Sequence, residues 1–188
     1  YNLQPKLYLS YERMAYFEKN DGSFRVTFDT DITTRRHDVR LELGSYGKKI
    51  IPENMFLMEI KINKAVPIWF TKILSEYDIY PVSFSKYGTE YKQYIMENYQ
   101  DPDLSVEQIC RILHMSPAYF STMFKKATGQ TYIGYLTDVR LNKAVELLNM
   151  TDDKTYVIAA KVGYQEQNYF SYVFKKKFGV SPTKFRGS

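Results

Sequence analysis

The stretch that decides the fold is Ser116–Gly129, with the sequence SPAYFSTMFKKATG, which recurs fifty positions later as Glu166–Gly179, EQNYFSYVFKKKFG. The two copies align without a gap and share the elements Tyr-Phe-Ser, Phe-Lys-Lys and a final glycine. A repeat with a fixed period of this length indicates a duplicated supersecondary unit. The aromatic, hydroxyl and basic residues of each copy suggest two units that hold DNA.

The composition allows one or two globular domains and indicates a polyanionic partner only weakly. The chain has 188 residues, of which 44% are hydrophobic, a net charge of +5 and a pI near 9.0. Residues 1–93 contain 14 basic and 12 acidic side chains, and residues 94–188 contain 12 and 9. Because the charge is spread so evenly, the positions of the basic residues must carry any argument for nucleic acid.

Several classes of site are excluded by counting residues. Cys110 is the only cysteine, so no internal disulfide can form, and its apolar helical surroundings predict a buried small residue. His37 and His114 are too few for a histidine-based metal site. No stretch approaches the roughly 20 apolar residues of a membrane span. We therefore expect a cytoplasmic protein.

The hydrophobic period divides the chain into two parts. Residues 1–62 alternate with a period of two, which predicts strands at 7–11, 24–28 and 56–62, and Pro67 opens a short helix at 67–77. From about residue 92 the period becomes helical. The expected helices lie at 94–99, 105–113, 116–128, 131–148, 155–162 and 166–178, with a last short segment from Pro182. The expected fold class is α+β, with an antiparallel β-rich part at 1–91 and an all-α domain at 92–188.

Residues that begin and end helices support this division. Ser105 can cap a helix start, and Gln108 three residues later completes a capping-box pattern. Ser116 followed by Pro117 is a cap followed by proline at the first helical position. Gly129 is a suitable C-cap for the helix that Ser116 starts.

Two pairs of expected helices have the layout of a helix–turn–helix, in which a supporting helix and a tight turn precede a second helix that enters the major groove. The pairs are 105–113 with 116–128, and 155–162 with 166–178. One side of each second helix has core spacing, through Phe120 and Phe124 and through Phe170 and Phe174. The opposite side carries the candidate DNA-binding residues, which are Ala118, Ser121, Thr122 and Lys125 in the first copy and Gln167, Asn168, Ser171, Tyr172 and Lys175 in the second.

These side chains suit two tasks at a duplex. Short polar groups near a helix start can reach base edges, and glutamine or asparagine can pair with adenine. Lysines further along suit phosphates, while Tyr119 and Tyr169 fit a partly buried packing role. An ordinary solvated helix face is the alternative, and it explains the lysines equally well when they are considered alone. It does not explain why the pattern repeats at a fixed offset.

Motifs along the whole helical part strengthen this interpretation. They are Ile109-Cys110, Met115 to Ser121, Phe124-Lys125-Lys126, Gly129, Arg140-Leu141, Ala144, Leu147-Leu148, Ile158-Ala159, Val162-Gly163-Tyr164, Tyr169-Phe170-Ser171, Phe174-Lys175-Lys176, Gly179, Ser181-Pro182 and Phe185-Arg186. Together they resemble the AraC/XylS family of transcription regulators over residues 94–186. The resemblance implies two helix–turn–helix units joined by a rigid helix at 131–148, with Arg140 bracing that helix. It implies double-stranded DNA as the partner, recognition helices about 34 Å apart, no catalytic residue and no required cofactor.

Charged side chains alternate with apolar ones on the expected strands of the front part. They are Arg13, Arg25, Asp29, Arg35, Arg36, Glu59, Lys61 and Lys86. Arginine forks match phosphate oxygens, and a carboxylate can hold a divalent metal ion that bridges phosphates. Spacing alone fits a basic channel or a sheet with a solvated outer face.

Four motifs in the front part, Tyr11–Tyr16, Arg25–Thr30, Met58–Lys61 and Phe84–Gly88, resemble the VTC domain, the polyphosphate-polymerase member of the triphosphate tunnel fold. The resemblance implies a partial tunnel or barrel and polyphosphate as a ligand. The implied phosphate-binding residues are Arg13, Arg25, Lys61, Ser85 and Lys86, with Arg35 and Arg36 as weaker candidates. The resemblance also implies a divalent metal ion, manganese or magnesium, at Glu59.

The front part matches only the second half of that tunnel, so we expect an open half-barrel with exposed strand edges and no polymerase activity from this chain alone. Three interpretations remain. The chain is a one-component regulator whose front part senses a phosphorylated or polyanionic ligand, a fusion of two unrelated fragments, or a truncated polyphosphate polymerase. DNA binding leads, because its whole apparatus is visible, while the DNA site and the oligomeric state are not indicated.

Overall fold

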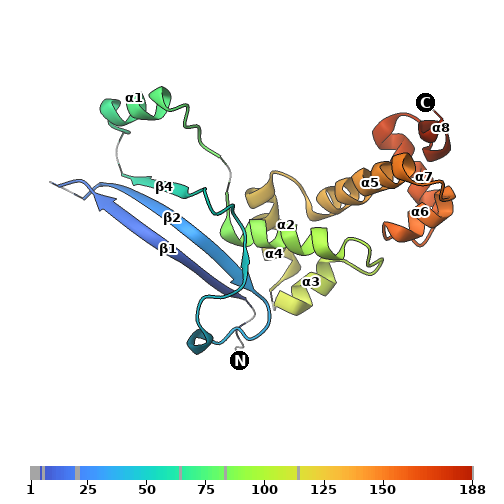
Figure 1. Ribbon diagram of the computed structural model, residues 1–188, viewed down its shortest axis with the longest axis horizontal. Helices are drawn as coiled ribbons and strands as arrows, with labels where there is room; N and C mark the ends of the chain where they lie inside the picture. The colour runs from blue at the N-terminus through green and yellow to red at the C-terminus, as the bar shows by residue number, and fades with distance from the viewer. Residues whose placement is uncertain are drawn as a thin grey trace. The chain divides into compact units, whose positions relative to one another are not determined.

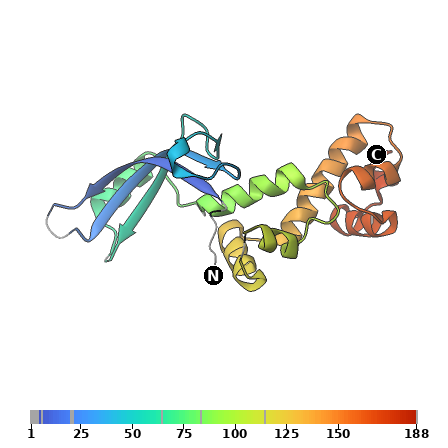
Figure 2. The same cartoon turned by 90° about the horizontal axis from the view of Figure 1, so that it is seen from below.

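The computed structural model describes residues 5, 7–19, 22–63, 65–82, 84–113 and 115–187 of the chain. It divides into two compact units, Tyr1–Lys86 and Tyr87–Ser188, which Figures 1 and 2 colour along the chain. The first unit is built on an antiparallel sheet and the second on helices, which confirms the expected α+β fold class. Among the described residues, no helix is long and apolar enough to cross a membrane.

Strand β2 (Phe24–Arg35) is the centre of the sheet. It pairs antiparallel with β1 (Tyr8–Phe17) on one side, and with β4 (Leu57–Ile62) and the two-residue β3 (Lys48–Lys49) on the other. Figure 1 shows β1 and β2 as a long ribbon. Both strands run further than the expected strands at 7–11 and 24–28, because ladder hydrogen bonds join backbone groups and continue past polar side chains. A short 3₁₀ helix, η1 (Leu41–Leu43), lies in the connection that follows β2.

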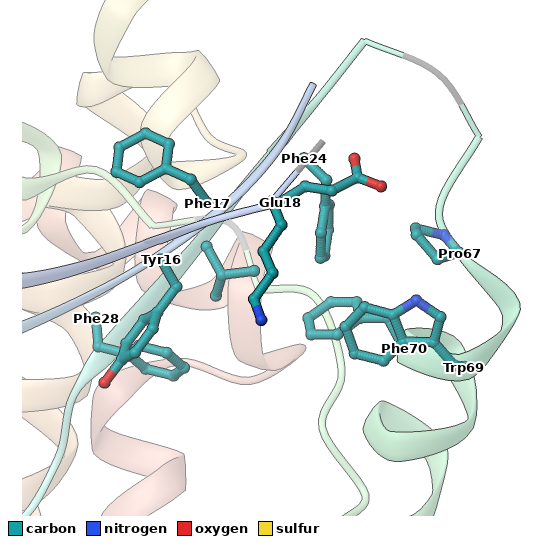
Figure 3. A pocket seen from close by; sticks show the side chains of 10 residues that line it. Tyr16, Phe17, Glu18, Phe24, Phe28, Pro67, Trp69 and Phe70 are labelled. Carbon is teal, nitrogen blue, oxygen red and sulfur yellow. The ribbon is translucent and has the colours of Figure 1, made fainter. Parts of the chain in front are cut away.

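One face of this sheet carries the core of the first unit. Alternate β2 residues Phe24, Val26 and Phe28 lie on that face, where they pack with apolar residues of β4 and of helix α1 (Ile68–Glu76). The ring centroids of Phe24 and Phe70 are 4.9 Å apart. Aromatic rings also line a cavity of about 460 Å³ between the strands and α1, shown in Figure 3. Helix α1 therefore packs on the apolar face of the sheet through Phe70 and Leu74.

Helices α2 to α8 build the second unit. Their bounds are α2 Lys86–Asn98, α3 Val106–Leu113, α4 Pro117–Thr128, α5 Tyr132–Met150, α6 Thr155–Lys161, α7 Gln167–Phe178 and α8 Pro182–Arg186. The starts of α3 to α8 agree with the expected helices, but the expected start of α2 at residue 94 is wrong. Residues 86–93 contain Gly88 and few apolar positions, so local propensity does not indicate a helix there. Packing of Tyr91 and Ile95 into the core stabilises the extra turns.

Helix ends follow the predicted capping chemistry with one difference. The Ser116 hydroxyl accepts a hydrogen bond from the Tyr119 N–H at 3.3 Å, and Gly129 ends the same helix in the left-handed region. The Ser105 hydroxyl accepts from the Gln108 N–H at 3.1 Å, which confirms the cap. The Gln108 side chain, however, donates to Asp101 at 3.3 Å, and this bond takes the place of the reciprocal half of the predicted capping box.

Helix α5 links two hydrophobic cores. Its first half supplies Tyr132, Leu136 and Val139 to a core with Phe120 and Phe124, which we call the first core. Its second half supplies Leu141, Ala144 and Leu148 to the second core, which contains Phe170 and Phe174. Cys110 is buried in the first core as predicted, and burial raises the pKa of its thiol. The repeated segments therefore build two equivalent cores on one continuous helix.

Arg140, in the middle of α5, joins the elements around it. Its Nε donates to the Tyr99 carbonyl at 2.8 Å, and its Nη2 donates to the Asp101 carbonyl at 2.7 Å. The guanidinium also lies over the Tyr164 ring, 5.4 Å from its centroid. Burial lowers the pKa of Arg140, and the two carbonyl bonds replace part of its lost hydration. The predicted bracing role of Arg140 is confirmed.

Gly163 makes this packing possible, and substituting it tests the arrangement. Its φ is +89°, and a Cβ there would lie 2.6 Å from the Tyr99 carbonyl oxygen and 2.9 Å from Arg140 Nε. Gly129 has a φ of +76° but open space around it, so Gly129→Ala is the matched control. We expect Gly163→Ala to lower the free energy of unfolding by about 3 kcal/mol and Gly129→Ala by about 1 kcal/mol. Urea denaturation followed by helical circular dichroism measures both, and equal losses would contradict the proposed contact.

Candidate nucleic-acid interface and basic sheet face

The recognition helices α4 and α7 each have a buried side and a solvent side. Phe120 and Phe124 on α4, like Phe170 and Phe174 on α7, are fully buried. The predicted DNA-binding residues lie on the other side, and all are exposed except the half-buried Ser171. They are Ala118, Ser121, Thr122 and Lys125 on α4, and Gln167, Asn168, Ser171, Tyr172 and Lys175 on α7. Each set is therefore collected on one helix surface that a ligand can approach.

Some of these polar groups already make local hydrogen bonds. The Thr122 hydroxyl donates to the Ala118 carbonyl at 3.0 Å, which turns it back toward its own helix. The Gln167 amide nitrogen donates to the Thr155 hydroxyl at 3.4 Å, and this bond links the start of α7 to the start of α6. Contact of these side chains with a base edge therefore requires that such bonds be shared or exchanged.

Tyr119 and Tyr169 differ from their predicted packing role. Their side chains are 61% and 56% exposed, so the prediction that they are partly buried packing residues is wrong. The ring of Tyr169 touches that of Tyr164, with 6.0 Å between centroids, but most of its surface faces solvent. Tyr119 and Tyr169 hold equivalent places in the two copies, but a repeated aromatic residue does not by itself indicate whether its ring is buried.

The lysines of the recognition helices have more than one role. Lys125, Lys126, Lys175, Lys176 and Lys177 all lie in last turns, where a positive charge offsets the partial negative charge of the helix end. Lys177 also forms an ion pair with Asp138 of α5, which attaches α7 to the connecting helix. Lys125 and Lys175 are exposed at equivalent positions and remain the candidates for phosphate contact.

The basic sheet face is the side of the first unit's sheet that points away from the apolar core. The strand register places Arg25 opposite Phe17 and Lys61, Thr27 opposite Ala15 and Glu59, and Asp29 opposite Arg13 and Leu57. Cross-strand partners in an antiparallel sheet share a face. The predicted phosphate-binding residues Arg13, Arg25 and Lys61 are therefore brought onto one face, together with the predicted metal ligand Glu59.

Asp29 is the centre of an ion cluster on this face. It is fully buried, and its carboxylate accepts two hydrogen bonds from Arg13, at 2.6 and 2.8 Å, and one from Lys86 Nζ at 2.6 Å. Burial raises the pKa of this carboxyl, but the bonds from Arg13 and Lys86 outweigh it and hold the pKa below the ordinary value. The same pair raises the pKa of Arg13. Two predicted phosphate ligands are thus already paired with one buried carboxylate, which sequence reasoning did not assign as their partner.

Glu59 does not make a metal site with its neighbours. Its carboxylate lies 3.5 Å from Arg13 Nη2 and 3.3 Å from Lys61 Nζ. Within the described part of the chain, no group of three or more histidine, cysteine, aspartate or glutamate residues is placed to hold a metal ion. One carboxylate binds Mg²⁺ only together with phosphate oxygens or water. The predicted metal ion at Glu59 therefore stays a prediction that depends on a bound phosphate.

Arg35 is occupied by the fold. Its guanidinium donates to the carbonyls of Asp38, Arg40, Gly44 and Tyr46 at 2.7–2.9 Å. It also lies between the rings of Tyr8 and Tyr46, at 3.5 and 4.3 Å from their centroids. It holds the loop after β2, which explains its burial and removes it from the candidate phosphate ligands.

The remaining candidates, Arg36 and Ser85, are half-buried. Ser85 directly precedes α2 and stands next to Lys86 in the chain. Position and burial alone do not test a phosphate-binding role for either residue.

The ion cluster predicts how acid affects the first unit. Because the pKa of Asp29 is lowered by folding, its stabilisation is complete above its ordinary value of 3.8 and is lost as the pH falls through the folded value. We expect Asp29→Asn to lower the free energy of unfolding at neutral pH by about 3 kcal/mol and to flatten its dependence on acid pH. The fluorescence of Trp69, the only tryptophan, reports unfolding of this unit.

Glu53→Gln is the control for that experiment. Glu53 is exposed and pairs with Lys49 at 2.8 Å, so its loss should change the stability by less than about 1 kcal/mol. If the stability of Asp29→Asn fell with acid pH as steeply as that of the unmodified chain, the ion cluster would not stabilise the sheet.

Two protein-family models match this chain. A VTC domain matches residues 1–95, which is half of the chain, and a helix-turn-helix domain matches residues 109–188. The matches do not overlap, and one contains the sheet while the other contains both recognition helices.

Known proteins resemble the helical part. The transcriptional activator RhaR of Pectobacterium carotovorum subsp. carotovorum is 41% identical over 80 residues, which are 43% of this chain and 28% of RhaR. The structure of the C-terminal domain of AraT, a response regulator from Geobacillus stearothermophilus, is 40% identical and covers 56% of this chain and 87% of that domain, with a TM-score of 0.54.

One neighbour contributes a likeness of fold alone. The DNA-binding domain of AdpA, solved in complex with a target DNA, has a TM-score of 0.50 at 23% identity and covers 53% of this chain and 89% of that domain. The matches to the first curated relatives cover only 28% to 37% of the lengths of those proteins. Part of this chain therefore corresponds to one part of each relative.

Proposed function

The chain belongs to the VTC domain family through residues 1–95 and carries an AraC-type helix–turn–helix domain at 109–188, and from this premise we propose that it is a transcription regulator that binds double-stranded DNA. The observation that supports the proposal most is the pair of recognition helices with matched cores and different solvent faces. Such a pair reads two different half-sites of one DNA target.

The connection between the helices supports a single composite site. Helix α5 contributes to both cores, and Arg140 bonds the segment after α2 while it packs against Tyr164. Two recognition helices on such a rigid support enter successive major grooves on one side of the duplex, about 34 Å apart. A half-site spacing of one helical turn is therefore expected in the target DNA.

On the solvent sides of α4 and α7, some residues suit contact with bases and others suit contact with phosphates. Asn168, in the first turn of α7, is exposed and has the amide that pairs with adenine. Lys125 and Lys175 lie two turns further along their helices and suit phosphates, which hold the protein in register without reading sequence.

Base reading is tested with the full chain and a duplex obtained by selection from random sequence. We expect Asn168→Ala to reduce the preference for the selected duplex over single-base variants by about 1–3 kcal/mol at one position. Lys175→Ala should instead weaken binding to all duplexes by the same factor. It should also reduce the magnitude of the slope of log affinity against log salt concentration by about 0.9. Gel-shift titrations in a salt series measure both quantities. Affinity of the unmodified chain that does not depend on sequence would defeat the proposal of a specific reader.

A phosphate-rich ligand on the basic sheet face is the second proposed function. This second function is favoured because Arg13, Arg25 and Lys61 lie on one face of the sheet. Lys86 joins them there by donating a hydrogen bond to Asp29. Because Asp29 already pairs with two of these cations, Arg13 and Lys86, a ligand must compete with it for them. A ligand with several charges, such as polyphosphate, competes better than a single phosphate. This proposal makes the chain a regulator whose front unit senses a polyanion.

Calorimetric titration of the full chain with linear polyphosphate tests this second function. We expect Lys61→Ala to weaken binding about tenfold, because one charge-assisted contact is lost. Lys72→Ala is the control, because Lys72 is exposed on α1, which packs on the opposite face of the sheet. The Lys61 variant should keep its DNA affinity, and Lys175→Ala should keep its polyphosphate affinity. Equal effects of Lys61→Ala and Lys72→Ala would assign the binding to general charge.

A further inference from the structure

The third residue of each recognition helix is a tyrosine that the core does not use. Helix α4 begins at Pro117 and helix α7 at Gln167, so Tyr119 and Tyr169 hold equivalent positions. Both rings are more than half exposed, unlike the phenylalanines that follow them, which are fully buried. The core does not explain why a large aromatic residue is exposed at the same place in two copies, so contact with a partner is the role to test.

The neighbours of these tyrosines suggest which part of a DNA duplex would suit them. Ala118 in the first copy corresponds to Asn168 in the second, and Thr122 corresponds to Tyr172. These pairs differ, as expected for residues that read different bases. An identical side chain in an equivalent position cannot distinguish two different half-sites. It suits the part of the duplex that is the same in both, which is the sugar–phosphate backbone.

We propose that the hydroxyl groups of Tyr119 and Tyr169 donate hydrogen bonds to DNA phosphates beside the two half-sites and so position each recognition helix. This inference rests on the proposed DNA binding and adds two contacts that none of the predicted DNA-binding residues supplies. Tyrosine hydroxyl groups are among the usual donors to phosphate oxygens. Ser121 and Ser171 are also shared, but Ser171 is half-buried and both side chains are short.

Ring packing prepares Tyr169 for this role. The Tyr169 ring rests against the Tyr164 ring at 6.0 Å, and Tyr164 in turn carries the guanidinium of Arg140 at 5.4 Å. A side chain with two rotatable bonds and one supported side loses little conformational entropy when its hydroxyl group is held. The packing therefore restricts the Tyr169 ring, whose hydroxyl group is proposed to contact the DNA backbone.

The test uses Tyr119→Phe and Tyr169→Phe in the full chain, which keep the ring and remove only the hydroxyl group. Fluorescence anisotropy measures affinity for the selected duplex and for a scrambled duplex over a salt series. We expect each substitution to weaken binding about threefold to tenfold, by the same factor on both duplexes. The salt slope should stay unchanged, because a neutral hydroxyl group releases no counterion, whereas Lys175→Ala lowers it by about 0.9. Tyr77→Phe, at an exposed tyrosine of the first unit, should change nothing.

Each other outcome overturns the inference in a recognisable way. Loss of affinity for the selected duplex alone would make the hydroxyl group a base reader. Unchanged affinity on both duplexes would remove these residues from the interface. A lower melting temperature in the phenylalanine variants would assign the hydroxyl groups to the fold. Failure of the unmodified chain to bind any duplex would refute the proposed function itself, whereas the other outcomes leave DNA binding in place.

Discussion

The buried guanidinium of Arg140 is the interaction on which the helical unit depends. A charge in the interior is costly unless hydrogen bonds replace its hydration, and two backbone carbonyls, from Tyr99 and Asp101, do so here. The bonds fix the segment after α2 against the middle of α5. They also need the close approach of Gly163, since any side chain there would collide with Arg140 and Tyr99. One charged residue thus determines how the two helix–turn–helix units share their connecting helix.

The sheet unit uses a buried charge of the opposite sign in the same way. Asp29 is fully buried and is held by Arg13 and Lys86, so the polar face has a negative centre surrounded by cations. The face is therefore less positive than a count of arginines and lysines suggests. Its affinity for phosphates depends on how readily the ligand replaces Asp29 as the partner of these cations. In the sheet unit, the fold and the proposed phosphate binding use the same charged groups, Arg13 and Lys86.

Sequence reasoning was most successful where a single local signal decides the structure. Ser116, Pro117 and Gly129 define α4 by capping chemistry alone, and the period of Phe120 and Phe124 identifies its buried side. Reasoning from sequence failed at Gly88, Tyr119 and Arg35. The early start of α2 depends on packing of Tyr91 and Ile95, and the exposure of Tyr119 depends on what lies beside α4. Arg35 binds four carbonyls that are brought to it by the loop after β2, which no spacing rule describes.

The sequence by itself determined the duplication, the division into a β-rich and a helical part, and the residues on the solvent side of each recognition helix. These features follow from period and capping, which act over a few neighbouring residues. Only the tertiary structure decided that Arg140 joins Tyr99 to α5, that Arg13 and Lys86 converge on Asp29, and that Tyr119 and Tyr169 face solvent. The reason is physical. The pKa of a charged group and the exposure of a ring depend on groups that are distant in the chain and meet only when the chain folds.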